Sequence, residues 1–170
     1  MQQSLDELFY HQFTKDVKSG KIETIDNLSG KIKQQGDSTK RQTKSLLSKV
    51  AFLINPDKFS LFDNLAKESV WELNKENKIF NRGELESYSF FIERVGKLLE
   101  DNATILENQK STLNSFKDTP AYVFFSEHPE AFFRRIIDKY LWVRKQTQNE
   151  KARKINNGPY LQFTKIGIMR

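Results

Sequence analysis

Apolar residues recur at intervals of three and four positions along most of this chain, and that spacing restricts it to a helical fold. The first example, Leu5, Leu8, Phe9, Phe13 and Val17, follows a capping-box pattern, Ser-x-x-Glu, at positions 4–7. Similar spacing, with Gly and Pro as breaks, predicts helices over residues 4–18, 21–35, 38–54, 63–73, 84–99, 102–116 and 129–145, with a helical turn at 121–125. The sequence therefore predicts a single all-α domain of about six to eight helices.

The positive charge of the chain is concentrated at its C-terminal end. From Arg144 onward there are seven bases and one acid, whereas residues 1–143 have 21 of each, so the net charge of +6 lies entirely in the last 27 residues. We therefore divide the chain into a helical domain, residues 1–145, and a basic tail, residues 146–170. The alternating pattern of residues 160–166 predicts that the tail is partly extended. Such a tail is typical of proteins that bind nucleic acid or another polyanion.

Composition excludes several other classes. The chain has 170 residues, of which 37% are apolar, enough for one hydrophobic core. It contains no cysteine and two histidines, His11 and His128, so we expect no disulfide, no thiol catalysis and no His-rich metal site. It also lacks a glycine-rich phosphate loop, an HExxH motif and a nucleophile elbow, and we predict no cofactor. Without an apolar stretch of membrane-spanning length or a secretion signal, we expect a cytoplasmic protein that does not bind membranes.

The segment from Ser48 to Asp63 indicates chemistry more sharply than any other. Lys49 lies in an apolar helix, Pro56 ends that helix, and Asp63 stands where the next helix should begin. A lysine amine made neutral by burial can act as a nucleophile, and a nearby carboxylate stabilises positive charge and moves protons. Lys49 and Asp63 are thus the candidate catalytic residues. The structural alternative is that Lys49 extends to solvent and Asp63 only caps a helix.

These residues resemble a known family. Residues 47–53, followed by Pro56, Phe59, Leu61 and Asp63, are similar to the helix-hairpin-helix DNA glycosylases, in particular those with the 8-oxoguanine glycosylase fold. A second similarity is residues 133–142, which contain the pattern Arg-x-x-Asp-x-x-Leu-Trp. The resemblance implies that Lys49 attacks C1′ of a flipped nucleotide and that Asp63 assists it. The family's hairpin glycines have no counterpart in residues 43–48, and the interval from Lys49 to Asp63 is short.

Bases in two segments are candidate phosphate ligands, because contacts to the nucleic-acid backbone need only positive charges on an accessible face. They are Lys40, Arg41, Lys44, Arg144, Lys145, Lys151, Arg153 and Lys154. A solvated helix face explains the first three equally well. Arg134, Arg135 and Asp138 have spacings that favour a structural ion pair instead.

Three functions follow from these patterns. The first is a DNA-binding helical protein of glycosylase-like fold without catalysis, and the second is an active DNA glycosylase or lyase that uses Lys49 and Asp63. The third is a non-enzymatic helical interaction or regulatory protein, for example phage-derived, whose basic tail binds an acidic protein partner.

Overall fold

The computed structural model confirms the all-α prediction. It describes residues 5–34, 40–75 and 79–157, and within these ranges it contains eight α-helices, two short 3-10 helices and no strand. The elements are α1 (Leu5–Lys18), α2 (Thr24–Gln34), α3 (Lys40–Ile54), α4 (Asn64–Asn74), η1 (Arg82–Glu86), α5 (Tyr88–Asp101), α6 (Ala103–Leu113), η2 (Asn114–Phe116), α7 (Pro120–Glu127) and α8 (Pro129–Asn157).

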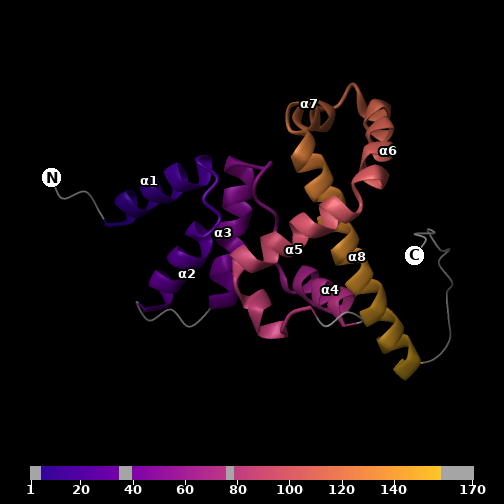
Figure 1. The fold of residues 1–170 in the computed structure, drawn as a ribbon, viewed down its shortest axis with the longest axis horizontal. Helices are drawn as coiled ribbons and strands as arrows, with labels where there is room; N and C mark the ends of the chain where they lie inside the picture. The colour runs from indigo at the N-terminus through magenta and orange to yellow at the C-terminus, as the bar shows by residue number, and fades with distance from the viewer. Residues whose placement is uncertain (1–4, 35–39, 76–78, 158–170) are drawn as a thin grey trace.

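The helices fall into two groups joined by α5. Figure 1 shows α1, α2 and α3 together at the N-terminal side, while α8 runs along the opposite side with α4 against it. Helix α5 contacts α2 in the first group and α8 in the second. Helices α6 and α7 cover only the end of α8 where that helix begins. The two groups therefore share one core, to which α6 adds the buried Leu106, whereas no residue of α7 is buried.

The core is built around Tyr88, the first residue of α5. Its ring is fully buried and lies 5.7 Å from the ring of Phe62 and 6.3 Å from that of Phe59, measured between centroids. The Tyr88 hydroxyl donates to the Ser60 carbonyl at 2.8 Å and accepts from the Ser60 N–H at 3.1 Å. Burial also raises the pKa of the Tyr88 hydroxyl. The segment between α3 and α4 is therefore held by an aromatic cluster and by hydrogen bonds that replace those of regular structure.

Two expected boundaries differ from those observed. The helix predicted over residues 84–99 is divided at Ser87, whose backbone is extended and whose hydroxyl accepts from the Phe90 N–H at the start of α5. Serine in this position competes with helix continuation, so the chain forms η1 and α5 in place of one helix. Helix α8 begins at Pro129 as predicted but does not end at Lys145, since it continues to Asn157. Residues 146–157 of the predicted tail are thus helical, and the strand-like residues 160–166 lie outside the described residues.

The apolar residues of α3 are not all buried, although the sequence predicted a helix that enters the core. Ser48 and Ala51 are buried, whereas Leu46 and Leu53 are 63% and 82% exposed. Helix α3 contacts α1 and α2 on one side, and its outer face has no neighbour among the described elements close enough to cover these leucines. The helix has apolar residues on nearly all sides but packs on only part of its surface.

Candidate Lys49–Asp63 site and basic surfaces

The segment that connects α3 to α4 is fixed against α3 close to Lys49. The hydroxyl of Ser48 accepts from the Phe62 N–H at 3.0 Å, in a buried position. At the other end of the segment, the Asn55 amide donates to the Val17 carbonyl at 3.0 Å. Asp63 then begins α4, with its carboxylate accepting from the Ala66 N–H at 2.8 Å. The predicted arrangement of helix, proline stop and aspartate cap is confirmed.

Lys49 is placed differently from the buried amine that a lysine nucleophile needs. Its side chain is exposed on the outer face of α3, between Leu46 and Leu53. Within the described residues it has no ion-pair or hydrogen-bond partner. The neighbouring Ser48 points to the Phe62 backbone, so successive positions of α3 face the core and the solvent. The structure brings Asp63 close to Ser48 but pairs no group with Lys49.

Asp63 lies near a second carboxylate that sequence analysis assigned to a structural ion pair. Asp138 of α8 accepts from the Arg135 guanidinium at 2.6 Å, which confirms the expected i,i+3 pair. Burial raises the pKa of Asp138 to about 6, Arg135 opposes this rise, and the negative charge of Asp63 adds to it. The Arg135 guanidinium also lies 5.8 Å from the ring centroid of Phe52 in α3. Helices α3, α4 and α8 thus meet at a small acidic cluster with one arginine.

Three of the predicted phosphate ligands instead have partners within the protein. Lys44 donates to the Asp26 carboxylate and to the Glu86 carbonyl, both at 2.5 Å, and its side chain is 14% exposed. Lys145 pairs with Glu72, and Arg144 donates to the Tyr140 hydroxyl at 3.3 Å. The two carboxylates compensate the charges of Lys44 and Lys145, whereas the neutral Tyr140 hydroxyl leaves the charge of Arg144 uncompensated. The ion pairs of Lys44 and Lys145 could not be predicted from the sequence, because their partners lie 18 and 73 residues away.

The remaining predicted phosphate ligands are placed by their helices only. Lys40 and Arg41 lie in the first turn of α3, and Lys151, Arg153 and Lys154 lie in the last two turns of α8. Their side chains lie outside the described part of the structure. In Figure 1 the last turns of α8 extend beyond α4. The positive charge expected in a partly extended tail is therefore carried in part by a helix.

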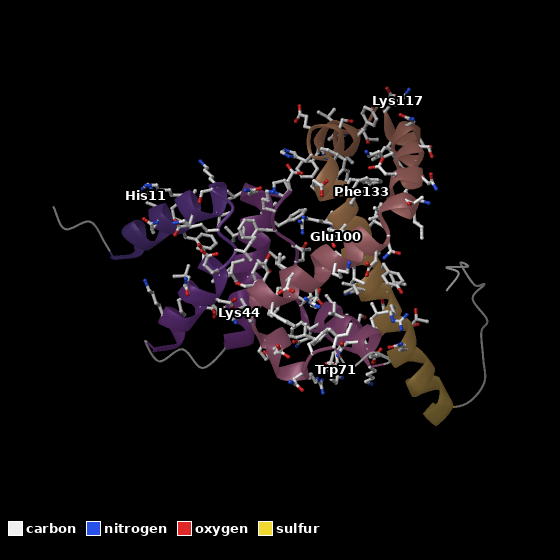
Figure 2. All side chains as sticks on the ribbon, in the orientation of Figure 1. His11, Lys44, Trp71, Glu100, Lys117 and Phe133 are labelled. Atoms are coloured by element: carbon white, nitrogen blue, oxygen red, sulfur yellow. The ribbon has the colours of Figure 1, made fainter. Side chains whose placement is uncertain are left out.

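Two charged residues that sequence analysis did not single out are central to the structure. Asp26 of α2 accepts from the backbone N–H groups of Tyr88 and Ser89 at 2.9 Å, in addition to Lys44. Its burial disfavours the charge, but Lys44 and the two N–H groups outweigh burial and hold the pKa of Asp26 below its usual value. Lys67 of α4 is buried and pairs with Glu86 at 2.9 Å. Figure 2 shows Lys44 within the inner part of the molecule, where α2, α3 and α5 meet.

Comparisons with known proteins add no assignment. No family model, no curated protein and no solved structure matches this chain. Among the described residues, no cluster of three or more His, Asp or Glu side chains is arranged to hold a metal ion. In the same part of the chain, no helix combines the length and apolarity that crossing a bilayer requires. The resemblance to the glycosylases remains a prediction from the sequence.

Proposed function

We propose that this chain is a DNA-binding helical protein whose main phosphate contacts are made by the end of α8. The observation that carries the proposal is that α8 continues past the body of the molecule and carries Lys151, Arg153 and Lys154 within two turns. The only acid after Arg144 is Glu150, so this end of the chain retains a strong excess of positive charge. A projecting basic helix can approach the DNA backbone without steric conflict with the core.

The internal ion pairs of Lys44 and Lys145 narrow the proposed interface. These two bases are paired with Asp26 and Glu72, so they contribute little to phosphate binding, while Arg144 donates only to the neutral Tyr140 hydroxyl and keeps its charge. Lys49 is exposed and can add a contact from α3. In this proposal the protein binds the negatively charged DNA backbone, and we assign it no base-specific contact.

Salt-dependent binding tests the proposal. Fluorescence anisotropy with a short duplex should give a dissociation constant that rises with salt, with a slope that falls by about one for each phosphate contact removed. Replacing Lys151, Arg153 and Lys154 by glutamine should weaken binding strongly. The matched control replaces Lys15, Lys18 and Lys58, which are exposed, lie outside α8 and have no ion pair among the described residues, and it has the same net charge. Equal losses in both triple variants, or no binding at low salt, would exclude the α8 interface.

A second candidate function is an active DNA glycosylase or lyase. The observation that favours it is the position of Asp63, which caps α4, lies beside the segment fixed by Ser48, and has Asp138 and Arg135 close by. Borohydride trapping on abasic DNA tests the lysine chemistry. A covalent complex that disappears in Lys49→Gln and persists in Lys58→Gln, a substitution of another exposed lysine, would support this candidate. If no complex forms with a protein that binds the same DNA, the chain acts by binding alone.

A further inference from the structure

The structure leaves two apolar surfaces uncovered at different places. The first, here called the α3 stripe, consists of Leu46, Lys49 and Leu53 on the outer face of α3. The second, here called the α7 groove, is a shallow and open depression on α7, lined in part by Lys117, Asp118, Pro120, Val123, Phe124 and Glu127. Large exposed apolar groups clustered in this way mark surfaces that bind another molecule.

The α3 stripe combines exposed leucines with positive charge. Leu46 and Leu53 are seven residues apart, which places them on one face of the helix about 10 Å from each other. Lys49 lies between them, and α3 contains four bases and no acid. Because Lys49 has no ion-pair partner in the described part of the chain, its charge is available to an acid on a binding partner.

The α7 groove has the opposite character. None of the residues of α7 is buried, and Val123 is 54% exposed. Asp118 and Glu127 lie near the two ends of this helix, and within the described residues neither has an ion-pair partner. The one base that lines the groove is Lys117. The groove is therefore apolar in its middle and acidic on balance at its edges.

We propose that the α3 stripe of one molecule docks into the α7 groove of a second copy of the same chain. The leucines meet Val123 and Phe124, and Lys49 meets the acids at the edge of the groove. Charge selects this pairing, because two α3 stripes would bring lysines together and two α7 grooves would bring acids together. The contact joins two different faces, so each copy keeps one stripe and one groove free for another copy.

This proposal is separate from DNA binding by α8. The proposed DNA-binding bases lie at the end of α8, whereas the α7 groove lies beside the helix that precedes the start of α8. It does compete with lysine chemistry at Lys49 and with a DNA contact by Lys49, because docking covers that side chain. DNA binding is tested with variants of α8 and assembly with variants of α3 and α7, so the failure of one proposal can be distinguished from the failure of the other.

Sedimentation velocity over a range of concentrations tests the assembly. The wild-type chain should show an average mass that rises above 20.0 kDa as its concentration increases. Leu53→Glu and Val123→Glu, each made at a largely exposed position, should each remain monomeric. Ile79→Glu, at a position that is 68% exposed and belongs to neither surface, is the matched control and should associate like the wild type.

Mixing the two monomeric variants gives the decisive result. Leu53→Glu retains an intact groove and Val123→Glu retains an intact stripe, so an equimolar mixture should form a one-to-one dimer and stop there. Lys49→Glu should weaken association about two- to fivefold, and mixing it with Glu127→Lys should restore that loss. A wild-type chain that stays monomeric at every concentration, or a mixture that remains monomeric, would overturn the proposal. So would dimers of Leu53→Glu alone.

Discussion

The segment between α3 and α4 and helix α7 have similar aromatic content but opposite environments. Phe59 and Phe62 are buried against Tyr88, with their neighbouring backbone bonded to Ser48 and Tyr88. In α7, Phe124 and Phe125 pack on each other at 5.1 Å, yet no residue of the helix is buried. Aromatic residues thus do not by themselves make a core. What distinguishes the two regions is whether other elements pack on both sides.

The largest expected effect is in the core. Tyr88→Ala should lower the free energy of unfolding by about 3–5 kcal/mol, because it leaves a cavity beside Phe59 and Phe62 and removes both hydrogen bonds to Ser60. Urea denaturation measures this loss. Phe124→Ala, its counterpart in α7, should cost much less, and a similar cost for both would show that α7 belongs to the core.

A smaller loss of stability is expected at the N-terminal end of α5. Asp26→Asn should cost about 2 kcal/mol, because it leaves Lys44 facing a neutral amide and weakens the bonds to Tyr88 and Ser89. Since folding lowers the pKa of Asp26, its contribution is present above the unfolded-state pKa and is lost as the pH falls through the folded-state pKa. The variant should therefore lose less stability than the wild type in acid. Denaturation at several pH values between 2 and 7 tests both statements.

Asp138 should show the opposite dependence on pH. Its pKa is raised to about 6, so its contribution is fully present below the unfolded-state value and is lost as the pH rises through 6. Between pH 4 and pH 7, ionisation of Asp138 should lower the free energy of unfolding by about 1–3 kcal/mol. Asp138→Asn should remove this dependence of stability on pH. Carboxyl NMR titration gives the pKa directly. In Asp63→Asn the pKa of Asp138 should fall in part, since burial is the larger cause, and an unchanged pKa would show that the two carboxylates do not interact.

The smallest effect is expected in α7. Val123→Ser should change the free energy of unfolding by less than about 0.5 kcal/mol, because the Val123 side chain is already more than half exposed. Thermal and urea denaturation at low protein concentration measure this change without a contribution from association. A loss above 1 kcal/mol would mean that a neighbouring element covers α7 in solution.

The parts of the fold predicted correctly are those with local causes. Pro129 begins α8, and Asp63 caps α4, because each effect depends on residues within one turn. Gly20, with a φ of 78°, follows α1, as expected for the residue that stopped the predicted helix. These signals are contained in a few neighbouring positions.

The candidate site was less predictable, because its contacts are distant in sequence. The exposure of Lys49 and Leu53 depends on which helices pack against α3, and hydrophobic spacing within α3 does not determine that. Lys44 was expected at a phosphate but pairs with Asp26, which is also bound by the start of α5. The residue pattern of 47–63 predicted the Asp63 cap correctly and did not determine the environment of the lysine.

The contacts that His128 and the first turns of α8 make with Asp57 also determine the order in which the fold can be completed. Asp57 accepts from the Ala131 N–H at 3.1 Å and pairs with His128 at 2.8 Å, while Arg134 donates to the Asp57 carbonyl at 2.8 Å. These bonds span 71 to 77 residues. During synthesis, Asp57 therefore cannot form them until more than seventy further residues have been added to the chain. A nascent chain that ends before His128 contains the residues of the N-terminal group but none of the three residues that bond to Asp57.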